Sequence, residues 1–441
     1  MFAGGFDLEA ATAVCPAAGL DVLAALVDRS LLLVQDLPEL DGPPYRMLEP
    51  IRQFPARHLA EAGEVQLIRT RHRDHYLRLA EAIQPLLLSP EEDRWRARLR
   101  TEQDNLRAAM AWSHDQGDGE SLTRMVSALI WFWATPGRIT EFAIWVDAAY
   151  DRVGELRPGM AAQILNFECL LAIISRRAVH SAPALASEAL KLARAAGDQG
   201  EEGLALAQLG LVAGVANGAD AMRPYIAQAL PLARSSGSAM GLVLSLAGFV
   251  GLRLFQSNPE EARRLAEELV AVAQMRGDRH HRLFARGFVG ITALVTGRLA
   301  DAVRVFEGNV AEGRRTNDSN YIHSLLGLAW VAMFRGSFQE ARDCVAEAVA
   351  SARKAGTDSV SITSVEPLAG WLRGWMELAA GNPAQACQSL AAAAAAVQSS
   401  TLTRHAALPL VVLAHAQLAW ASRAKRWPFS TTPPRSRAPA R

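Results

Sequence analysis

The side chains in this sequence that come nearest to a metal site are two histidines one helical turn apart. His72 and His75 occur in the segment RHRDHY, and this spacing would place both imidazoles on one side of a helix. A zinc site needs further ligands, and no cysteine or carboxylate–histidine set accompanies this pair. Arg71 and Arg73 make the segment electropositive. We therefore predict a solvated basic helix face here and no metal site.

The sequence also contains none of the common enzyme motifs that we sought. It has no G-x-x-x-x-G-K-[ST] loop to hold a nucleotide phosphate and no G-x-S-x-G nucleophile motif. The paired acids Glu91–Glu92 and Glu260–Glu261 are expected in first turns of helices, where the helix dipole favours negative charge. His280 and His281 are adjacent, so they would point to different faces and open a helix. We predict a protein without catalytic residues, cofactor or metal.

Cysteine usage indicates an intracellular protein, and the net charge indicates that nucleic acid and anionic membranes are not its ligands. The four cysteines are far apart and form no C-x-x-C pair, which predicts buried, reduced thiols in a cytosolic protein: Cys15, Cys169, Cys344 and Cys387. The 46 basic and 45 acidic residues leave a net charge of +1. A chain with this charge has no overall field that would attract nucleic acid or an anionic membrane.

Two uncharged stretches approach the length of a membrane span. They are Ser235 to Leu252 and Ala406 to Ser422, and both contain polar residues, glycine or proline. Both also fall in register with the repeats described next, so we expect buried helices of a soluble array. The N-terminus, MFAGGFDLEAA, lacks the basic and apolar regions of a signal peptide. These features predict a cytoplasmic protein that does not enter a membrane.

The strongest pattern in the chain is a repeat of about 40 residues. Helix-terminating residues recur at steps of 40, 40, 40 and 39: Gly197, Gly237, Gly277, Asn317 and Gly356. Glycine and asparagine tolerate the left-handed backbone conformation that closes many helices. Each repeat therefore contains at least one helix that ends at the same relative position, which is the signature of a stacked helical array.

A second set of residues marks the other helix of each repeat. Short turns end in alanines at Ala262, Ala302, Ala341 and Ala386. Twelve residues before the last three of them lie Gly290, Ala329 and Gly374, whereas Val250 occupies that position in the first. Small residues at two such positions let paired helices pack closely. The pattern resembles a long form of the tetratricopeptide repeat and predicts an all-α fold, a tetratricopeptide-like α-solenoid preceded by a small winged-helix-like module.

The remaining segments define four regions. Residues 1–65 contain two short helix candidates, Leu8 to Cys15 and Asp21 to Asp28, and then two strand-like runs, SLLLVQD and YRML, before a third helix. We interpret them as the winged-helix-like module. Residues 66–158 are predicted to be a helical linker with capping helices, residues 159–422 the repeats, and residues 423–441, rich in Pro, Ser and Arg, a disordered tail.

Five segments in fixed order resemble a known family. FAGGFDLEAATAVC, VLAALVDRSLLLV, YRMLEPIRQFPARHLAEAGE, RHRDHYLRLAEA and LRTEQDNLRAAMAWS are similar to the region after the nucleotide-binding core of bacterial STAND-type regulators. These are predicted-ATPase transcriptional regulators of the LuxR and SARP-like type with NB-ARC-like modules and tetratricopeptide repeats. One departure is Pro55, which should kink or restart the IRQF helix.

The resemblance implies a sensing role. In this family an effector or partner that binds the repeats controls an ATPase core, and this sequence lacks that core's phosphate loop. We therefore expect the chain to act only as the receiving part, either with an ATPase domain on another chain or as a truncated remnant of a regulator. Two alternatives stay open: a free-standing tetratricopeptide-repeat scaffold, and a fragment of a larger ATPase or nucleotidyl cyclase regulator.

The expected binding surface is the groove lined by the first helix of each repeat. Counting back from the marker alanines places these residues toward it: Phe255, Ile291, Trp330, Met333, Phe334, Trp371 and Trp375. Aromatic and methionine side chains suit adaptable binding of apolar segments. We predict a protein or peptide partner, or a small effector, in this groove.

Direct DNA binding is not expected from this chain. The winged-helix-like module carries the basic residues Arg46, Arg52, Arg57 and His58, and such modules can place a helix in the major groove. In the resembled family, however, this module packs against the ATPase as a regulatory lever, and a separate domain binds DNA.

Overall fold

The N-terminal part of the protein forms a small module of two helices and a hairpin. The computed structural model describes residues 2–34, 45–47, 58–133, 139–175, 179–256, 258–277, 279–316, 318–354 and 360–398. Helices α1 (Leu8–Val14) and α2 (Leu20–Asp28) precede strands β1 (Leu32–Val34) and β2 (Tyr45–Met47), which pair antiparallel. Asp7 caps the N-terminus of α1, because its carboxylate accepts a hydrogen bond from the Ala10 amide at 2.7 Å. Most of the predicted third helix, including Arg52, Pro55 and Arg57, lies outside the described residues.

The helical region that follows packs around one apolar core. It comprises helices α4 (Val65–Ile83), η1 (Gln84–Leu88), α5 (Glu92–Thr101), α6 (Gln103–Asp115), α7 (Gly119–Ala128), α8 (Ile130–Trp133), α9 (Ile139–Tyr150) and η2 (Val153–Glu155). Tyr76, Met110 and Trp133 are fully buried at its centre. This core also takes in Ile164 and Phe167 from the first repeat, so the linker and the solenoid share buried apolar surface.

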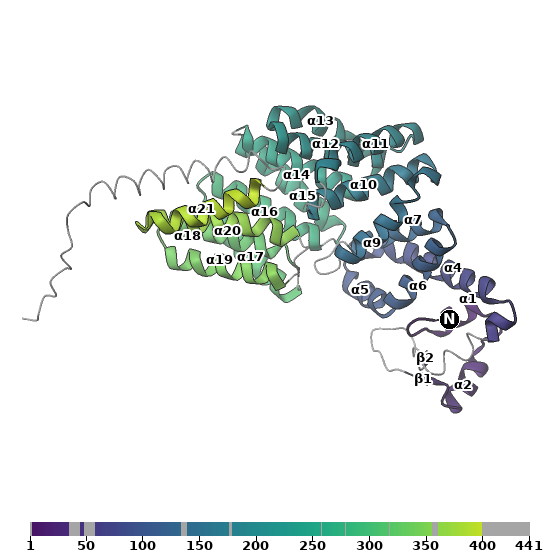
Figure 1. Cartoon of the computed structure of the whole chain (residues 1–441). Coiled ribbons are helices and arrows are strands. Elements are labelled where there is room, and N and C mark those ends of the chain that lie inside the picture. The colour runs from purple at the N-terminus through teal and green to yellow at the C-terminus, as the bar shows by residue number, and fades with distance from the viewer. Residues whose placement is uncertain are drawn as a thin grey trace, which may run out of the picture.

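Residues 158–398 form an α-solenoid, as the repeat pattern predicts (Figure 1). Consecutive helices pair as α10 (Pro158–Ser175) with α11 (Ala182–Ala196), α12 (Gln199–Asn217) with α13 (Ala219–Ser236), α14 (Ala239–Phe255) with α15 (Pro259–Met275), α16 (Arg279–Val295) with α17 (Leu299–Thr316), α18 (Tyr321–Phe334) with α19 (Phe338–Lys354), and α20 (Val360–Ala379) with α21 (Pro383–Gln398). The short helix η3 (Val179–Ser181) lies within the first pair. The uncharged stretch Ser235 to Leu252 falls in this array, and the stretch from Ala406 lies outside the described residues.

The predicted repeat markers have the expected conformations. Gly197 and Gly237 cap α11 and α13 with φ of 69°, and Gly277 has the same φ after α15. The marker alanines are fully buried: Ala262, Ala302, Ala341 and Ala386. Asn317 and Gly356 lie outside the described residues. The periodic positions therefore identify helix ends and helix contacts correctly.

Two contacts between paired helices explain the close packing of the solenoid. A Cβ atom at Gly290 of α16 would overlap the ring of Phe306, which lies four residues after the marker Ala302 on α17. The equivalent contact in the last pair joins Gly374 and Leu390. In these two pairs the glycine of the first helix thus receives a large side chain of its partner helix, which sets the distance between the two helices.

The first helices of neighbouring repeats form the inner layer of the array. Contacts join α10 to α12, α12 to α14, α14 to α16, α16 to α18 and α18 to α20, whereas the second helices contact mainly the first helices. Helix α20 also contacts α10, so the array curves back toward its own first helix. None of the helices in the described residues is long and apolar enough to cross a membrane.

The cysteines differ from the prediction in their burial. All four are free thiols, and Cys169 is buried, with a pKa that burial raises to about 12. Cys15, however, is exposed, because it caps the C-terminus of α1 at the surface of the N-terminal module. Cys344 and Cys387 are partly buried.

Candidate ligand-binding surfaces of the solenoid

Four of the predicted groove residues form one continuous aromatic surface on α18 and α20. Trp330 and Phe334 follow one another by one turn on α18, as do Trp371 and Trp375 on α20. The ring centroids of Trp330 and Trp371 lie 4.5 Å apart, and those of Trp371 and Trp375 lie 6.1 Å apart. We call these four residues the aromatic stripe. Because α18 and α20 are first helices, the stripe belongs to the inner layer of the array.

The stripe offers exposed apolar surface. Phe334 is 58% exposed and Trp375 is 38% exposed, while Trp330 and Trp371 are partly buried against the core of these repeats. The indole Nε1 of Trp371 is buried without a hydrogen-bond acceptor among the described residues. Adjacent rings with one open face can bind an apolar side chain by burial and ring stacking.

The other predicted groove residues do not join the stripe. Met333 is only 8% exposed and packs inside the core formed by α18, α19 and α20, because its position turns it toward the partner helices. Ile291 is 38% exposed on α16. The side chain of Phe255, at the end of α14, lies outside the described residues.

A cavity of about 280 Å³ lies where the linker meets the inner layer of the solenoid. It is bounded by η1, by the α7–α8 region and by the first helices α10, α12 and α14, and we call it the inner cavity. Its lining is mostly apolar with several amides and hydroxyls: Gln84, Pro85, Leu88, Ser127, Ile130, Trp131, Gln163, Phe167, Glu201, Leu204, Ser238, Ala239 and Met240. Among these residues Glu201 alone carries a formal charge.

Glu201 is held in the inner cavity by neighbouring amides. The Nδ2 atom of Asn166 donates to Oε2 of Glu201 at 2.8 Å and to its backbone carbonyl at 3.1 Å. Burial raises the pKa of the Glu201 carboxyl to about 7, with Asp198 adding to the increase and hydrogen bonds from Asn166 and Gln163 opposing it. A carboxyl group with this pKa can gain or lose a proton near neutral pH, which makes it the most chemically responsive group of the cavity.

The sequence does not indicate that Glu201 lies in a cavity. Glu201 lies three residues after Asp198, whose side chain caps α12 by accepting from the amides of Gly200 and Glu201 at 3.0 Å. Such an acid in a first turn is the normal companion of an N-cap. Only the packing of η1 and α8 over this turn turns Glu201 into a cavity residue.

Replacing Glu201 by glutamine should flatten the pH dependence of stability. In the wild-type chain the folded state holds the Glu201 proton more tightly than the unfolded state does. The associated stability is complete below pH 4.5 and is lost as the pH rises to about 7. The loss amounts to about 2–3 kcal/mol. Urea unfolding at pH 5 and pH 8 should show this difference in the wild type and a smaller one in Glu201→Gln. An equal difference in both chains would contradict the assignment.

A larger hollow, of about 450 Å³, is a weaker candidate. It lies between α15, α16 and α17 and is lined by Glu267, Val270, Arg286, Val289, Arg304, Val305 and Gly308. Its charged residues are already paired: Glu267 with Arg263, Arg286 with Glu312, and Arg304 with Asp301. It therefore presents no unmatched charge to a ligand.

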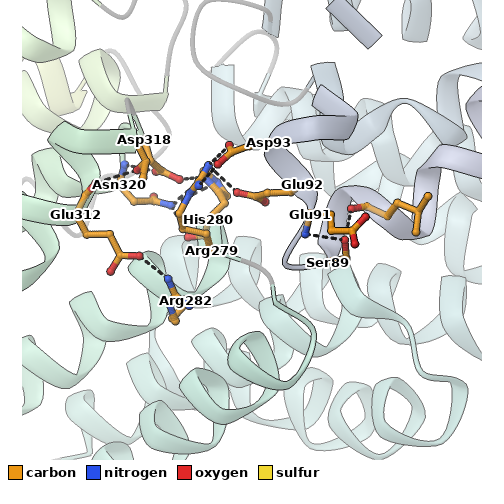
Figure 2. Close-up of polar contacts among 12 residues, drawn as sticks. Ser89, Glu91, Glu92, Asp93, Arg279, His280, Arg282, Glu312, Asp318 and Asn320 are labelled. Carbon is orange, nitrogen blue, oxygen red and sulfur yellow. Dashed lines mark hydrogen bonds and ion pairs between the residues drawn. The ribbon is translucent and has the colours of Figure 1, made fainter. Parts of the chain in front are cut away.

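A cluster of ion pairs fastens the linker to the middle of the solenoid (Figure 2). Arg279, the first residue of α16, contacts Glu92 at 2.7 Å and both carboxylate oxygens of Asp93 at 2.9 Å. Close by, Gly277 packs so tightly that a Cβ atom there would lie 2.5 Å from Pro90. We call this contact the clasp. It joins residues 186 positions apart in the chain.

The clasp extends along α16 to the next repeat. The Nδ1 atom of His280 lies 3.0 Å from Oδ2 of Asp318, and Nδ2 of Asn320 donates to the His280 carbonyl at 2.9 Å. On the other side, the His281 ring meets Trp131 edge to face with centroids 5.0 Å apart. Trp131 also lines the inner cavity. The clasp and the inner cavity are therefore parts of one junction.

This junction corrects the sequence-based interpretation of Glu92. The acid does lie in the first turn of α5, as predicted. Its side chain is nevertheless buried, 5% exposed, and paired with Arg279. The pKa of the neighbouring Asp93 is lowered by its hydrogen bonds to the Arg279 guanidinium. The helix dipole is thus only one of the interactions that favour acids at this position.

The predicted basic face at His72 and His75 is wrong. Both imidazoles are buried, at 4% and 6% exposure. His72 packs between Phe2 and Tyr76, and burial lowers its pKa to about 4. The N-terminal module covers this face of α4, which the sequence of α4 alone does not reveal. No group of three metal-ligating side chains occurs in the described part of the chain.

The N-terminal module is attached to the linker through Asn105. Its Oδ1 accepts from the amides of Ala3 and Gly4 at 2.8 and 3.1 Å, and its Nδ2 donates to the carbonyl of Gly5 at 2.6 Å. Arg98 contacts Asp7 at 2.5 Å beside it. Asn105 is fully buried, so this set of bonds fixes the orientation of the module.

Comparisons with known proteins agree with the repeat fold and find similarity to proteins named transcriptional regulators. The chain is 29% identical over 330 residues to proteins named HTH-type transcriptional regulators in Mycobacterium bovis and Mycobacterium tuberculosis, covering 72% of this chain and 37% of theirs. The chain thus spans just over a third of the length of these relatives. No family model matches it.

Two solved structures share the fold. One is a signal transduction ATPase with numerous domains from Pyrococcus horikoshii that carries a tetratricopeptide repeat sensor, with a TM-score of 0.54 and 13% identity over 96% of this chain and 61% of that one. The other is a Rap protein complexed with competence and sporulation factor, with a TM-score of 0.53 and 13% identity over 79% of this chain and 99% of that one. The protein is therefore a tetratricopeptide-like α-solenoid, similar in sequence to HTH-type transcriptional regulators.

Proposed function

We propose that this chain is the sensing and protein-interaction part of a STAND-type transcriptional regulator, acting in the cytoplasm and without catalysis of its own. The observation that carries the proposal is the aromatic stripe, an exposed apolar surface on the inner layer of a regulator-like solenoid. Similarity to transcriptional regulators supports the regulatory role. A Rap protein of the same fold, solved with a bound factor, supports binding by the array.

The proposed partner is an apolar peptide segment, and an ATPase core would respond to its binding. The N-terminal module acts in this proposal as a winged-helix-like lever of the LuxR-type regulators. Its attachment through the buried Asn105 supports such a role, because a lever must move as one body with the linker. The chain itself would not contact DNA.

The stripe can be tested with a displayed library of short peptides and the purified chain. Peptides with an aromatic or leucine anchor should bind, and Phe334→Ala/Trp375→Ala should weaken their affinity by about 30-fold or more, since truncated aromatic anchors typically cost 2 kcal/mol or more. Ile144→Ala is the matched control, because Ile144 is 57% exposed on α9, outside the solenoid repeats. Equal affinity of wild type and double variant would refute the role of the stripe.

A further inference from the structure

We propose that the inner cavity binds an organic ammonium ion on an apolar carbon skeleton, with Glu201 as its counter-ion. The inference rests on the proposed function, because it gives the sensing solenoid a small effector. It concerns a different part of the molecule from the aromatic stripe, so the two can be tested separately.

The charge of the cavity selects a cation. Among the described residues that line the cavity, Glu201 alone carries a formal charge, and none is a lysine or an arginine. A carboxylate or phosphate ligand would meet this acid without any compensating cation. An ammonium group would form a charge-assisted hydrogen bond with the largely buried carboxylate of Glu201.

The hydrogen bonds of the lining residues leave Glu201 as an acceptor for a donor-rich ligand. Nε2 of Gln84 donates to the Ser127 carbonyl at 3.3 Å, and the Ser127 hydroxyl donates to Oε1 of Gln163 at 2.6 Å. Oε2 of Glu201 accepts from Nδ2 of Asn166 at 2.8 Å. A carboxylate can accept further hydrogen bonds, which suits a group that donates three hydrogen bonds and accepts none.

The other lining residues of the inner cavity are suited to an apolar carbon skeleton next to the ammonium group. Trp131 and Phe167 contribute aromatic rings, and Leu204 and Met240 contribute aliphatic surface. Aromatic rings close to an ammonium group add cation–π attraction. A cavity of about 280 Å³ has room for a compact aromatic or branched amine and excludes a folded partner. The ligand class is therefore a small monoamine, or the free N-terminal residue of a peptide.

A ligand bound in the inner cavity would also stabilise the junction that contains the clasp. The cavity is assembled from η1 and α8 of the linker together with three repeats, and Trp131 contacts both the cavity and His281. A ligand that fills it binds the closed arrangement and not an open one, so it should stabilise the junction by mass action.

Calorimetric titration of the full chain with 2-phenylethylamine tests the assignment. The amine should bind at least tenfold more tightly than 2-phenylethanol, which has the same skeleton without the charge. Glu201→Gln should lose at least tenfold in affinity for the amine. The matched control is Glu202→Gln, because Glu202 lies on the same turn and pairs with Arg194. Equal binding of amine and alcohol, or of wild type and Glu201→Gln, would overturn the proposal.

Two further measurements are needed. The first distinguishes a peptide N-terminus from a small amine, and the second distinguishes this inference from the proposed function. A phenylalanine-initiated tripeptide with a free N-terminus is compared with its N-acetylated form: tighter binding of the free form than of 2-phenylethylamine identifies a peptide terminus, and the reverse identifies a small amine. Phe334→Ala/Trp375→Ala should retain amine binding. Peptide affinity that is the same in the wild type and in Phe334→Ala/Trp375→Ala, with amine binding intact, would count against the proposed function alone. Stripe-dependent peptide binding without Glu201-dependent amine binding would count against this inference alone.

Discussion

Replacing Arg279 by methionine is expected to open the clasp and destabilise the junction between linker and solenoid by about 2–4 kcal/mol. The substitution keeps an aliphatic stem but removes the guanidinium that faces Glu92, which is only 5% exposed, and Asp93. Removing one partner of a buried ion pair is costly because the remaining charge is held away from water. Small-angle scattering should show a larger radius of gyration, and hydrogen exchange should be faster in α5 and α16.

Two companion variants make this experiment specific. Glu92→Gln combined with Arg279→Met should recover much of the lost stability, since the buried charge is then gone. Arg263→Met is the matched control, because Arg263 forms ion pairs with Glu260 and Glu267 on the exposed face of α15 and such pairs contribute little. A scattering profile of Arg279→Met identical to that of the wild type would show that the clasp does not hold the junction closed.

The same substitution at two glycines of α16 should have opposite effects. At Gly290 a Cβ atom would overlap the Phe306 ring, so Gly290→Ala is expected to cost about 1–3 kcal/mol by forcing α16 and α17 apart. At Gly287 a Cβ atom meets nothing within 4 Å. Gly287→Ala should therefore stabilise the helix by about 0.5–1 kcal/mol, because alanine loses less backbone entropy than glycine on folding. Urea unfolding measures both.

A second-site change tests the cause of the Gly290 effect. If the Phe306 ring is responsible, Phe306→Leu combined with Gly290→Ala should be less destabilised than the sum of the two single variants. Strictly additive effects, or destabilisation by Gly287→Ala of the same size, would show that the close contact between α16 and α17 is not the origin.

Much of the fold is predictable from the sequence because repeat arrays are built from local signals. The glycines that end helices, such as Gly197 and Gly237, act through their own backbone conformation. The marker alanines act between helices that follow one another directly. Each of these signals lies within one repeat of about 40 residues, so it is visible in a short window.

The aromatic stripe was predictable for the same reason, and only in part. Trp330 and Trp375 occupy equivalent positions of neighbouring repeats, each directly after the small residue of its first helix, and their ring centroids lie 6.3 Å apart. Met333 was assigned to the same surface but is buried, because one residue along a helix rotates the side chain by about 100° and a single marker does not define the direction to that accuracy.

The sequence by itself therefore determined the helical repeat, its phase and the helices that carry the aromatic stripe. Only the tertiary structure decided what happens where distant segments meet: the burial of His72, the position of Glu201 in the inner cavity, and the pairing of Arg279 with Glu92. The physical reason is that each effect joins elements far apart in the chain. The N-terminal module covers His72 on α4, whereas the curvature of the solenoid, which is the sum of small packing angles between successive helices, brings α16 to the linker. That sum brings together residues 186 positions apart, and no local pattern encodes it.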